Sequence, residues 1–435
     1  MKMCVVIVAV AGFSVSSFAQ GSLTPPGAPA PTMKTLEQVE ARTPVSGAMT
    51  LSQSGSYYLT GNVTNGGITV SASDVTLDLN GFSIIGNSSG NGIAVNGVQN
   101  VVVRNGSVRG FSIGVLASGT IGCRFEKLVV SESDTTGFYF NGVGGACNAN
   151  TVEACTVIGN GERGIHFIGN VGECSFNLVK DCAIGNNNGD GIYFEGQSAG
   201  SCNENRVVDS LIVGNSDRGV LFNGTGGSCS GNEIAGCRIS RNLYGGISMG
   251  AGCNDNRILD NTIVDNSGSA AGLAVLGSSN LISGNIVKGN TSNYDFSEDN
   301  QLNLLISEIP ESLDWPCSVK LTGSLTSSGD GITITMSGVT VNLAGFSLSG
   351  DGIKAWGATN APLSGICIKN GLLRDYYTGV NFVQVNGSRL ENLIVRNTCV
   401  GHDDNFSLDA ADTYGPEITA PGEIGSTNPW ANFSF

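Results

Sequence analysis

Short apolar runs, each broken by glycine, asparagine or a charged residue, recur along most of this chain. The stretch 202–222 holds three such runs, and each has the length of a strand and is too short for a helix. Apolar residues alternate within a run, which predicts that Ile165 and Phe167 face inward while His166 faces outward. Three strands per coil, joined by bends and stacked in parallel, predict an all-β solenoid of the β-helix type.

A glycine followed by alternating apolar residues marks each coil in the middle of the chain. The phrase begins at Gly137, Gly164, Gly191, Gly219, Gly246 and Gly272. Successive glycines are 27, 27, 28, 27 and 26 residues apart. A fixed period of this size is typical of a repeat protein in which each unit packs against its neighbours, so a chain of 435 residues needs no single large core.

Asparagine recurs in register with these apolar positions. One column stands four residues before the glycine, and a second stands two residues before an inward-facing aliphatic side chain. The columns are Asn160, Asn187, Asn215 and Asn242, and Asn150, Asn177, Asn205, Asn232, Asn256 and Asn280. Amides stacked about 4.8 Å apart can hydrogen-bond along a column, and asparagine tolerates the left-handed backbone of tight bends. We therefore predict structural asparagine ladders.

Cysteine also recurs in columns. In one column Cys155, Cys182 and Cys237 alternate with serine and asparagine, which indicates a small group facing a bend and argues against a metal site. The other column is Cys123, Cys147, Cys174, Cys202, Cys229 and Cys253. Neighbours there would lie one strand spacing apart, so disulfides and a stack of buried thiols are both open alternatives. The paired Cys-x-x-Cys spacing of a zinc site is absent from this column.

The N-terminus has the features of an export signal. Lys2 provides a positive start, an apolar stretch covers 5–15, and Ser17-Phe18-Ala19 resembles a cleavage site. We therefore expect an exported protein, located in the periplasm, at the cell surface or in the medium. No later apolar segment has the length of a membrane span, so none is expected.

The charge balance narrows the class of partners. The chain has 36 acidic against 21 basic residues, a formal net charge of −15, which argues against nucleic acid as a partner. The 64 glycines and the low share of charged residues, 13%, favour tight turns around a core over a disordered polymer.

The opening module of the repeat returns near the end of the chain. Segment 78–84 reads Asp-Leu-Asn-Gly-Phe-Ser-Ile and 342–348 reads Asn-Leu-Ala-Gly-Phe-Ser-Leu, while 101–106 matches 366–371 in the same way. Between the copies, acidic residues and two prolines in 294–316 break the pattern. We therefore predict a signal peptide at 1–19 and a proline-rich arm and N-terminal cap at 20–50, with a possible short helix at 35–42. The predicted β-helical parts are a main β-helix at 51–293 and a second module at 317–405, separated by a linker or cap at 294–316 and followed by a C-terminal tail at 406–435.

The repeat Asn-x-Val-x-x-Cys/Asn-x-Ile-x-x-Asn, followed by Gly-Ile-x-Phe, resembles that of the pectin-lyase-like superfamily. The resemblance covers 51–290 and 319–404, and the whole chain is similar to secreted, mostly uncharacterised β-helix repeat proteins of bacteria. It implies a right-handed parallel β-helix. The superfamily contains pectate lyases, polygalacturonases, alginate-acting enzymes, epimerases, phage tailspikes and non-catalytic adhesins, so the resemblance alone assigns no activity.

The chemistries of that superfamily require residues that this chain lacks. Polygalacturonase-like hydrolysis needs acid and base carboxylates with a histidine and an Arg-x-Lys pair, whereas His166 and His402 are the two histidines and neither has a Gly-His-Gly context. Asp403-Asp404 follows the last coil and is interpreted as a solvated turn. Carboxylates scattered one per coil rarely provide the six or more oxygens of a calcium site, so calcium is possible but not indicated and no cofactor is predicted.

One exposed strip on the long coils remains as a candidate ligand site. Tyr139, His166 and Tyr193 are predicted to project outward at one column, where a sugar chain could stack on the aromatic rings. The candidate residues are Tyr139, His166, Tyr193, Glu195, Arg163, Asp190, Asp217 and Arg218, and no catalytic or metal-binding residue is assigned. The alternative is ordinary cross-strand pairing on a solvated surface.

The absence of an assembled catalytic set favours an exported, non-catalytic β-helix with a structural or polysaccharide-contacting role. The competing hypothesis is a carbohydrate-active enzyme, either a polysaccharide lyase or a glycoside hydrolase, that acts on an acidic polysaccharide through the same strip. Periplasmic metal handling is disfavoured by the two histidines and six methionines.

Overall fold

The computed structural model describes residues 42–434, apart from 298–299, 309–310, 359–360, 375–377, 384, 386–392, 401–403, 408–412, 415–416 and 419–431. The predicted signal peptide, most of the proline-rich arm and cap, His402 and Asp403 therefore lie outside the described residues. Of the possible helix from Thr35, the described part is Arg42, which begins a strand. None of the described residues forms a helix of sufficient length and hydropathy to cross a bilayer.

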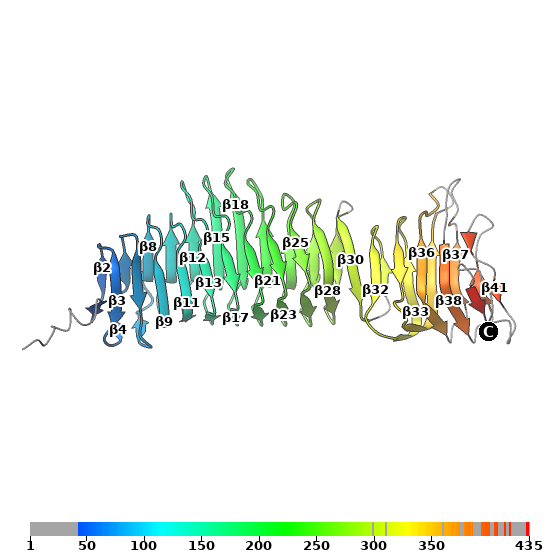
Figure 1. The fold of residues 1–435 in the computed structure, drawn as a ribbon, viewed down its shortest axis with the longest axis horizontal. Coiled ribbons are helices and arrows are strands. Elements are labelled where there is room, and N and C mark those ends of the chain that lie inside the picture. The colour runs from blue at the N-terminus through cyan, green and yellow to red at the C-terminus, as the bar shows by residue number, and fades with distance from the viewer. Residues whose placement is uncertain are drawn as a thin grey trace, which may run out of the picture. The chain divides into compact units, whose positions relative to one another are not determined.

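The regular elements of residues 42–434 are β-strands, and the named strands pair in parallel in two sheets (Figure 1). The eleven-stranded sheet contains β2 (Met49–Leu51), β5 (Ile68–Val70), β8 (Asn91–Asn96), β10 (Ile113–Ser118), β12 (Thr136–Asn141), β15 (Ile165–Asn170), β18 (Ile192–Gln197), β21 (Arg218–Asn223), β24 (Gly245–Met249), β27 (Leu273–Val275) and β29 (Tyr294–Phe296). Each of these strands lies beside the equivalent strand of the next coil. This stack is the predicted right-handed parallel β-helix.

The 31-stranded sheet forms the remaining walls of the coils. Its strands up to residue 288 are β1 (Arg42–Val45), β3 (Gly55–Leu59), β4 (Val63–Thr64), β6 (Val75–Asp78), β7 (Ser83–Ile85), β9 (Val102–Arg109), β11 (Arg124–Ser131), β13 (Thr151–Glu153), β14 (Thr156–Ile158), β16 (Leu178–Lys180), β17 (Ala183–Gly185), β19 (Arg206–Val208), β20 (Leu211–Val213), β22 (Glu233–Ala235), β23 (Arg238–Ser240), β25 (Arg257–Leu259), β26 (Thr262–Val264) and β28 (Leu281–Lys288). The later strands are β30 (Gln301–Ile306), β31 (Glu311–Leu313), β32 (Ser318–Leu321), β33 (Leu325–Ile334), β34 (Thr340–Asn342), β35 (Ser347–Trp356), β36 (Cys367–Arg374), β37 (Thr378–Val383), β38 (Leu393–Val400), β39 (Asp404–Ser407), β40 (Thr413–Tyr414), β41 (Glu417–Ile418) and β42 (Asn432–Ser434).

The core is a column of side chains that runs through the stacked coils. Phe140, Phe167, Phe194 and Phe222 lie one above the next, with ring centroids 4.6, 5.0 and 4.7 Å apart. These distances match the spacing between neighbouring strands, because the four residues occupy equivalent positions on successive coils. The rings are nearly parallel and form one stack. The predicted inward direction of Ile165 and Phe167 is confirmed, since both side chains are buried.

Two asparagine ladders line the bends of the coils, as predicted. In one ladder the Nδ2 of Asn177 donates to Oδ1 of Asn205 at 3.0 Å, and the backbone N–H of Asn177 donates to the same oxygen at 2.9 Å. The other ladder repeats this pattern between Asn187 and Asn215, at 2.9 and 3.2 Å. Each buried amide therefore satisfies a backbone donor of the preceding coil, which keeps the bends free of unpaired polar groups.

Strand pairing in the 31-stranded sheet continues through the segment predicted as a linker. Within 294–316, β30 pairs with β28 on one side and with β32 on the other. The eleven-stranded sheet ends at β29 in this segment. At the other end, β1 and β2 pair with β3 and β5, so described strands of the stack also lie before residue 51. The division of the β-helix into two domains stays a prediction.

Candidate functional site

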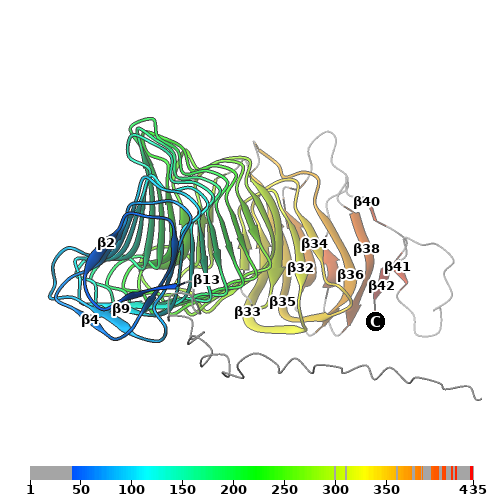
Figure 2. The same ribbon diagram turned by 60° about the vertical axis from the view of Figure 1, so that its left-hand side comes forward.

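Three neighbouring strands bring the outward-facing aromatic residues of the candidate site into register. Tyr139 of β12 lies opposite His166 of β15, and His166 lies opposite Tyr193 of β18. The loops in this part of the stack project together beyond the coils (Figure 2). We call the eight candidate residues the outer strip: Tyr139, His166, Tyr193, Glu195, Arg163, Asp190, Asp217 and Arg218.

The outer strip is less exposed than predicted. The His166 ring lies between the rings of Tyr139 and Tyr193, with centroid distances of 5.1 and 4.9 Å. His166 and Tyr193 are each 6% exposed, and Tyr139 is half-buried. Because rings one strand spacing apart cover each other, the faces toward the histidine are not free for a sugar. The prediction that His166 and Tyr193 are exposed is therefore wrong.

The structure gives His166 a carboxylate partner that the sequence did not identify. His166 Nε2 lies 3.0 Å from Glu195 Oε2, and both side chains are buried. Burial holds the pKa of His166 below its usual value, although the hydrogen bond to Glu195 acts in the opposite direction. The imidazole is therefore neutral near pH 7, and its Nε2–H donates to the carboxylate.

The Glu195 carboxylate accepts hydrogen bonds from three neighbouring side chains. Burial alone would raise the pKa of Glu195, but hydrogen bonds from His166, Gln197 and Tyr193 together hold that pKa below its usual range. The Tyr193 hydroxyl in turn accepts a hydrogen bond from Asn223 Nδ2 at 3.0 Å. Glu195 is therefore an ionised carboxylate inside a connected hydrogen-bond network.

The charged residues before these strands pack against the same column. The guanidinium carbon of Arg163 lies 4.7 Å from the centroid of the Tyr193 ring. Arg218 lies 3.1 Å from Asp217 and 3.9 Å from Asp190, and its guanidinium covers Tyr244 at 4.4 Å. Both arginines are therefore engaged in contacts within the strip.

Asp190 is the carboxyl group of the strip with the raised pKa. Burial, followed by repulsion from the Asp217 carboxylate, raises the pKa of Asp190 to about 6. An acid whose folded pKa is raised adds stability below its unfolded pKa, and that stability is lost as the pH rises through the folded pKa. At pH 7.5 the ionised Asp190 therefore lowers the stability of the fold.

We expect Asp190→Asn to raise the free energy of unfolding at pH 7.5 by about 1–2 kcal/mol, because the amide removes the buried charge. Its Oδ1 can still accept the hydrogen bond that Arg218 N–H makes to Asp190 at 3.2 Å. Unfolding midpoints at pH 4.5 and 7.5 test this expectation, with a gain confined to the higher pH. The control is Asp134→Asn at an exposed carboxylate. An equal gain at both pH values would contradict the explanation.

The arrangement pairs a neutral imidazole with an ionised carboxylate, and either group has the chemistry of a general base. A base must also reach the proton that it abstracts. His166 and Glu195 are 6% and 8% exposed and satisfy each other, so the geometry of the strip does not present them to a polymer.

The six cysteines of the second column are free thiols, and each is fully buried. Burial raises the pKa of Cys123 to about 11, so this side chain is protonated. Asparagines of the ladder donate to these sulfurs, for example Asn177 to Cys174 Sγ at 3.6 Å and Asn205 to Cys202 Sγ at 3.5 Å. Whether the column forms disulfides stays a prediction, which a free-thiol count on unfolded, unreduced protein would test.

Three cavities lie outside the strip, on the outer face of the 31-stranded sheet. The first has a volume of about 310 Å³ and contains Lys320, Asn342 and Lys369 among its lining residues. None of these three residues belongs to the candidate site that the sequence predicted. The signal that could have found them is the duplication, in which Asn342 and Lys369 replace Asp78 and Arg104.

Comparison with known proteins identifies one matching family. The model of the family described as "Periplasmic copper-binding protein (NosD)" matches residues 83–305, which is more than half of the chain. No curated protein matches the chain.

Several solved structures show a similar arrangement. They include the mannuronan C-5 epimerase AlgE4 A-module of Azotobacter vinelandii, with 13% identity, 86% of this chain and 90% of that chain covered, and a TM-score of 0.37. The Dettilon tailspike protein has 12% identity, coverage of 75% and 61%, and a TM-score of 0.32. ORF18 of Geobacillus virus E2 has 12% identity and a TM-score of 0.28, with 75% of this chain and 52% of that chain covered. At these values the similarity concerns the fold and not the function.

Proposed function

The chain belongs to the family of periplasmic copper-binding proteins (NosD), and we propose that it is an exported, non-catalytic β-helix that contacts polysaccharide. The family description places such proteins in the periplasm, which supports export. Between periplasm, cell surface and medium, the periplasm is the compartment that this membership favours.

The observation that supports a polysaccharide contact is the register of the outer strip. Tyr139, His166 and Tyr193 repeat one position over three successive coils, and Leu116 and Leu221 extend the column at either end. A linear polymer that lies along the stack would meet an amphipathic edge at each strand spacing. Tyr139 is the half-buried member that offers the most ring surface among the three aromatic residues.

The non-catalytic part of the proposal is supported by the burial of the strip's acid–base groups. The side chains of His166 and Glu195 are buried and form a hydrogen bond of 3.0 Å between Nε2 and Oε2. The same pair is also the one observation that favours the competing hypothesis, because a histidine with a positioned carboxylate can act as a general base once substrate reaches it. A polysaccharide lyase or glycoside hydrolase is therefore the second candidate.

The residues of the described chain do not fit a copper centre. Copper sites use histidine, cysteine and methionine ligands. The described residues bring no group of three or more histidine, cysteine or acidic side chains together in a metal-binding arrangement. The stacked thiols are buried and accept hydrogen bonds from the asparagine ladder. We therefore assign no role to copper in the proposed function.

Binding and turnover on a panel of pectin, alginate, chondroitin and neutral glycans test the proposal. We expect binding without unsaturated products or new reducing ends. Tyr139→Ala should weaken binding about three- to tenfold, because it removes the most exposed ring of the strip. Tyr58→Ala is the matched control, since Tyr58 is also half-buried but lies in β3, outside the strip. Turnover that is abolished by His166→Gln would instead establish the enzyme.

A further inference from the structure

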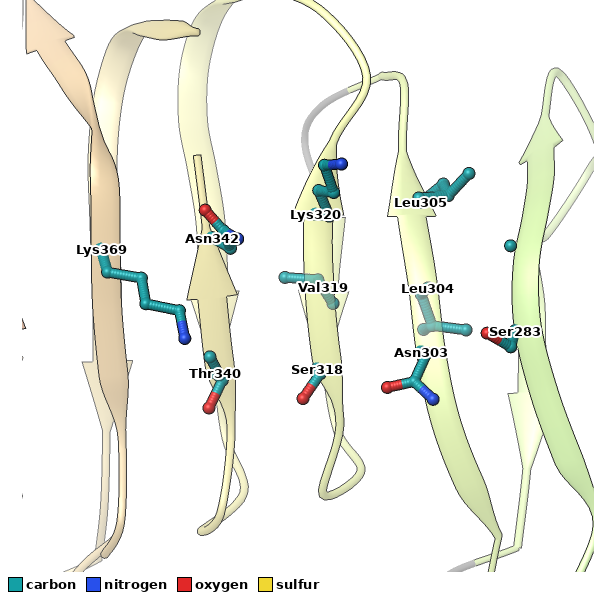
Figure 3. A pocket seen from close by; sticks show the side chains of 11 residues that line it. Ser283, Asn303, Leu304, Leu305, Ser318, Val319, Lys320, Thr340, Asn342 and Lys369 are labelled. Atoms are coloured by element: carbon teal, nitrogen blue, oxygen red, sulfur yellow. The ribbon is translucent and has the colours of Figure 1, made fainter. Parts of the chain in front are cut away.

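The cavity of about 310 Å³ lies across five consecutive strands of the 31-stranded sheet, β28, β30, β32, β34 and β36. Its polar side chains form two rows that run from strand to strand (Figure 3). One row contains Lys320, Asn342 and Lys369, and the other contains Ser283, Asn303, Ser318 and Thr340. Five strands at a spacing of about 4.8 Å make this face about 19 Å long.

The cavity is cationic although the protein as a whole is acidic. Its lining contains two lysines and no aspartate or glutamate. Lys320 is exposed and Lys369 is half-buried, and neither forms an ion pair with a carboxylate of the described residues. By contrast, Lys180, on the same sheet, lies 3.3 Å from Asp181 and 4.0 Å from Glu153. This face is therefore locally positive on a protein whose net charge is −15.

Comparison of the two copies shows why Lys369 has no carboxylate beside it at this position. In the first copy Asp78 lies opposite Arg104 in the strand register, and Arg104 Nε donates to Asp78 Oδ2 at 3.1 Å. In the second copy Asn342 lies opposite Lys369 at the equivalent positions. The replacement of the acid by its amide removes the negative charge and leaves the neighbouring cation in place.

The same replacement keeps the local hydrogen bonds. Asp78 Oδ1 accepts from Asn80 N–H at 2.9 Å and from Asn105 Nδ2 at 3.2 Å. Asn342 Oδ1 accepts from Ala344 N–H at 3.0 Å and from Asn370 Nδ2 at 3.2 Å. The backbone of the second copy therefore needs the side-chain oxygen but not the charge, so the loss of charge is separable from the structural role.

We infer that this face binds an acidic glycan chain, with Lys320 and Lys369 contacting its carboxylate or sulfate groups. The two lysines are two strand spacings apart, about 10 Å, so they can contact separate anionic groups of one chain. Hydroxyl and amide groups of the other row offer hydrogen-bond partners to sugar hydroxyls along the same direction. The Asp260 carboxylate borders Gly284 at the β28 end of the cavity, away from the β36 strand that carries Lys369.

This inference names the substrate class of the proposed polysaccharide contact but uses a different face of the coils. It does not require the outer strip to bind. Calorimetric titration of the full mature chain with oligogalacturonate, chondroitin sulfate oligosaccharide, a neutral glucan oligosaccharide and inorganic sulfate tests it. We expect both acidic oligosaccharides to bind at least about tenfold more tightly than the neutral one or sulfate ion, with affinity falling as salt rises.

Three variants test the cationic row. Lys320→Gln and Lys369→Gln should each weaken acidic oligosaccharide binding about three- to tenfold. Asn342→Asp should weaken it by a similar factor, because a carboxylate at this position would pair with Lys369 as Asp78 pairs with Arg104. The first copy already contains an aspartate at the equivalent site, so this variant is expected to fold.

The control is Lys180→Gln, which removes a lysine that is already paired with carboxylates and should leave binding unchanged. Unchanged binding in Asn342→Asp, or equal affinity for neutral and acidic oligosaccharides, would overturn the inference, and equal affinity for sulfate ion would overturn the assignment of a glycan chain. Loss of binding in Asn342→Asp but not in Tyr139→Ala would support this face and reject the outer strip. The reverse result would retain the proposed function and reject this face.

Discussion

Replacing Asn187 with alanine is expected to lower the free energy of unfolding by about 3–5 kcal/mol, because the amide satisfies several buried groups at once. Its Oδ1 accepts from the backbone N–H of Asn160 at 3.1 Å and from Asn160 Nδ2 at 2.9 Å. Its Nδ2 donates to Asn215 Oδ1 at 2.9 Å. Alanine would leave these partners buried without water and would break the ladder in both directions.

The adjacent residue supplies a matched control. Asn188 is exposed, and its backbone N–H bonds the Asn160 carbonyl at 2.9 Å, a contact that alanine keeps. Asn188→Ala should therefore change stability by less than about 0.5 kcal/mol. Denaturant unfolding measures both variants, and amide hydrogen exchange of coils 151–213 shows whether the loss begins at the ladder. Equal stabilities of the two variants would contradict a structural role for the ladder.

Gly164→Ala is expected to destabilise the fold by about 3 kcal/mol or more, since the coils approach too closely for a methyl group. A Cβ at this position would lie 2.6 Å from the Gly191 carbonyl oxygen, 2.8 Å from Asn187 Nδ2 and 2.8 Å from Ile184 Cγ2. The carbonyl belongs to the equivalent glycine of the next coil, which is held in the strand ladder and cannot easily shift. The repeated glycine is thus needed because the gap to the next coil leaves no room for a Cβ.

Gly145→Ala is the control for this substitution, because no atom beyond the adjacent residues lies within 4 Å of the position that a Cβ would occupy. We expect it to change the unfolding midpoint little, whereas Gly164→Ala should lower it by several degrees. The two midpoints are compared by circular dichroism during heating. A similar midpoint for both variants would mean that the coils can separate locally to admit the methyl group.

The candidate site was only partly predictable from the sequence. The period placed Tyr139, His166 and Tyr193 in one column, and the structure confirms this register. Their exposure could not be read in the same way, because it depends on how neighbouring rings and the Arg163 side chain cover one another. Alternation indicates which side of a strand a residue occupies, but it does not indicate whether water reaches it.

The bond between His166 and Glu195 illustrates the same limit. The two residues lie one coil apart and two register positions from each other, since His166 is opposite Tyr193. The sequence placed both on the outer face of the sheet. Their diagonal contact depends on the side-chain conformations that the ring stack permits, and these conformations are set by packing.

The class of fold, the inward face of the repeated strands and the asparagine ladders follow from the sequence alone, because strand alternation and a nearly constant period leave one way to stack the coils. Only the three-dimensional contacts show that His166 and Tyr193 are buried, that His166 has a carboxylate partner and that Lys369 has none among the described residues. These properties arise from contacts between side chains in different coils. Such contacts depend on distances of a few ångströms that a repeat pattern does not encode.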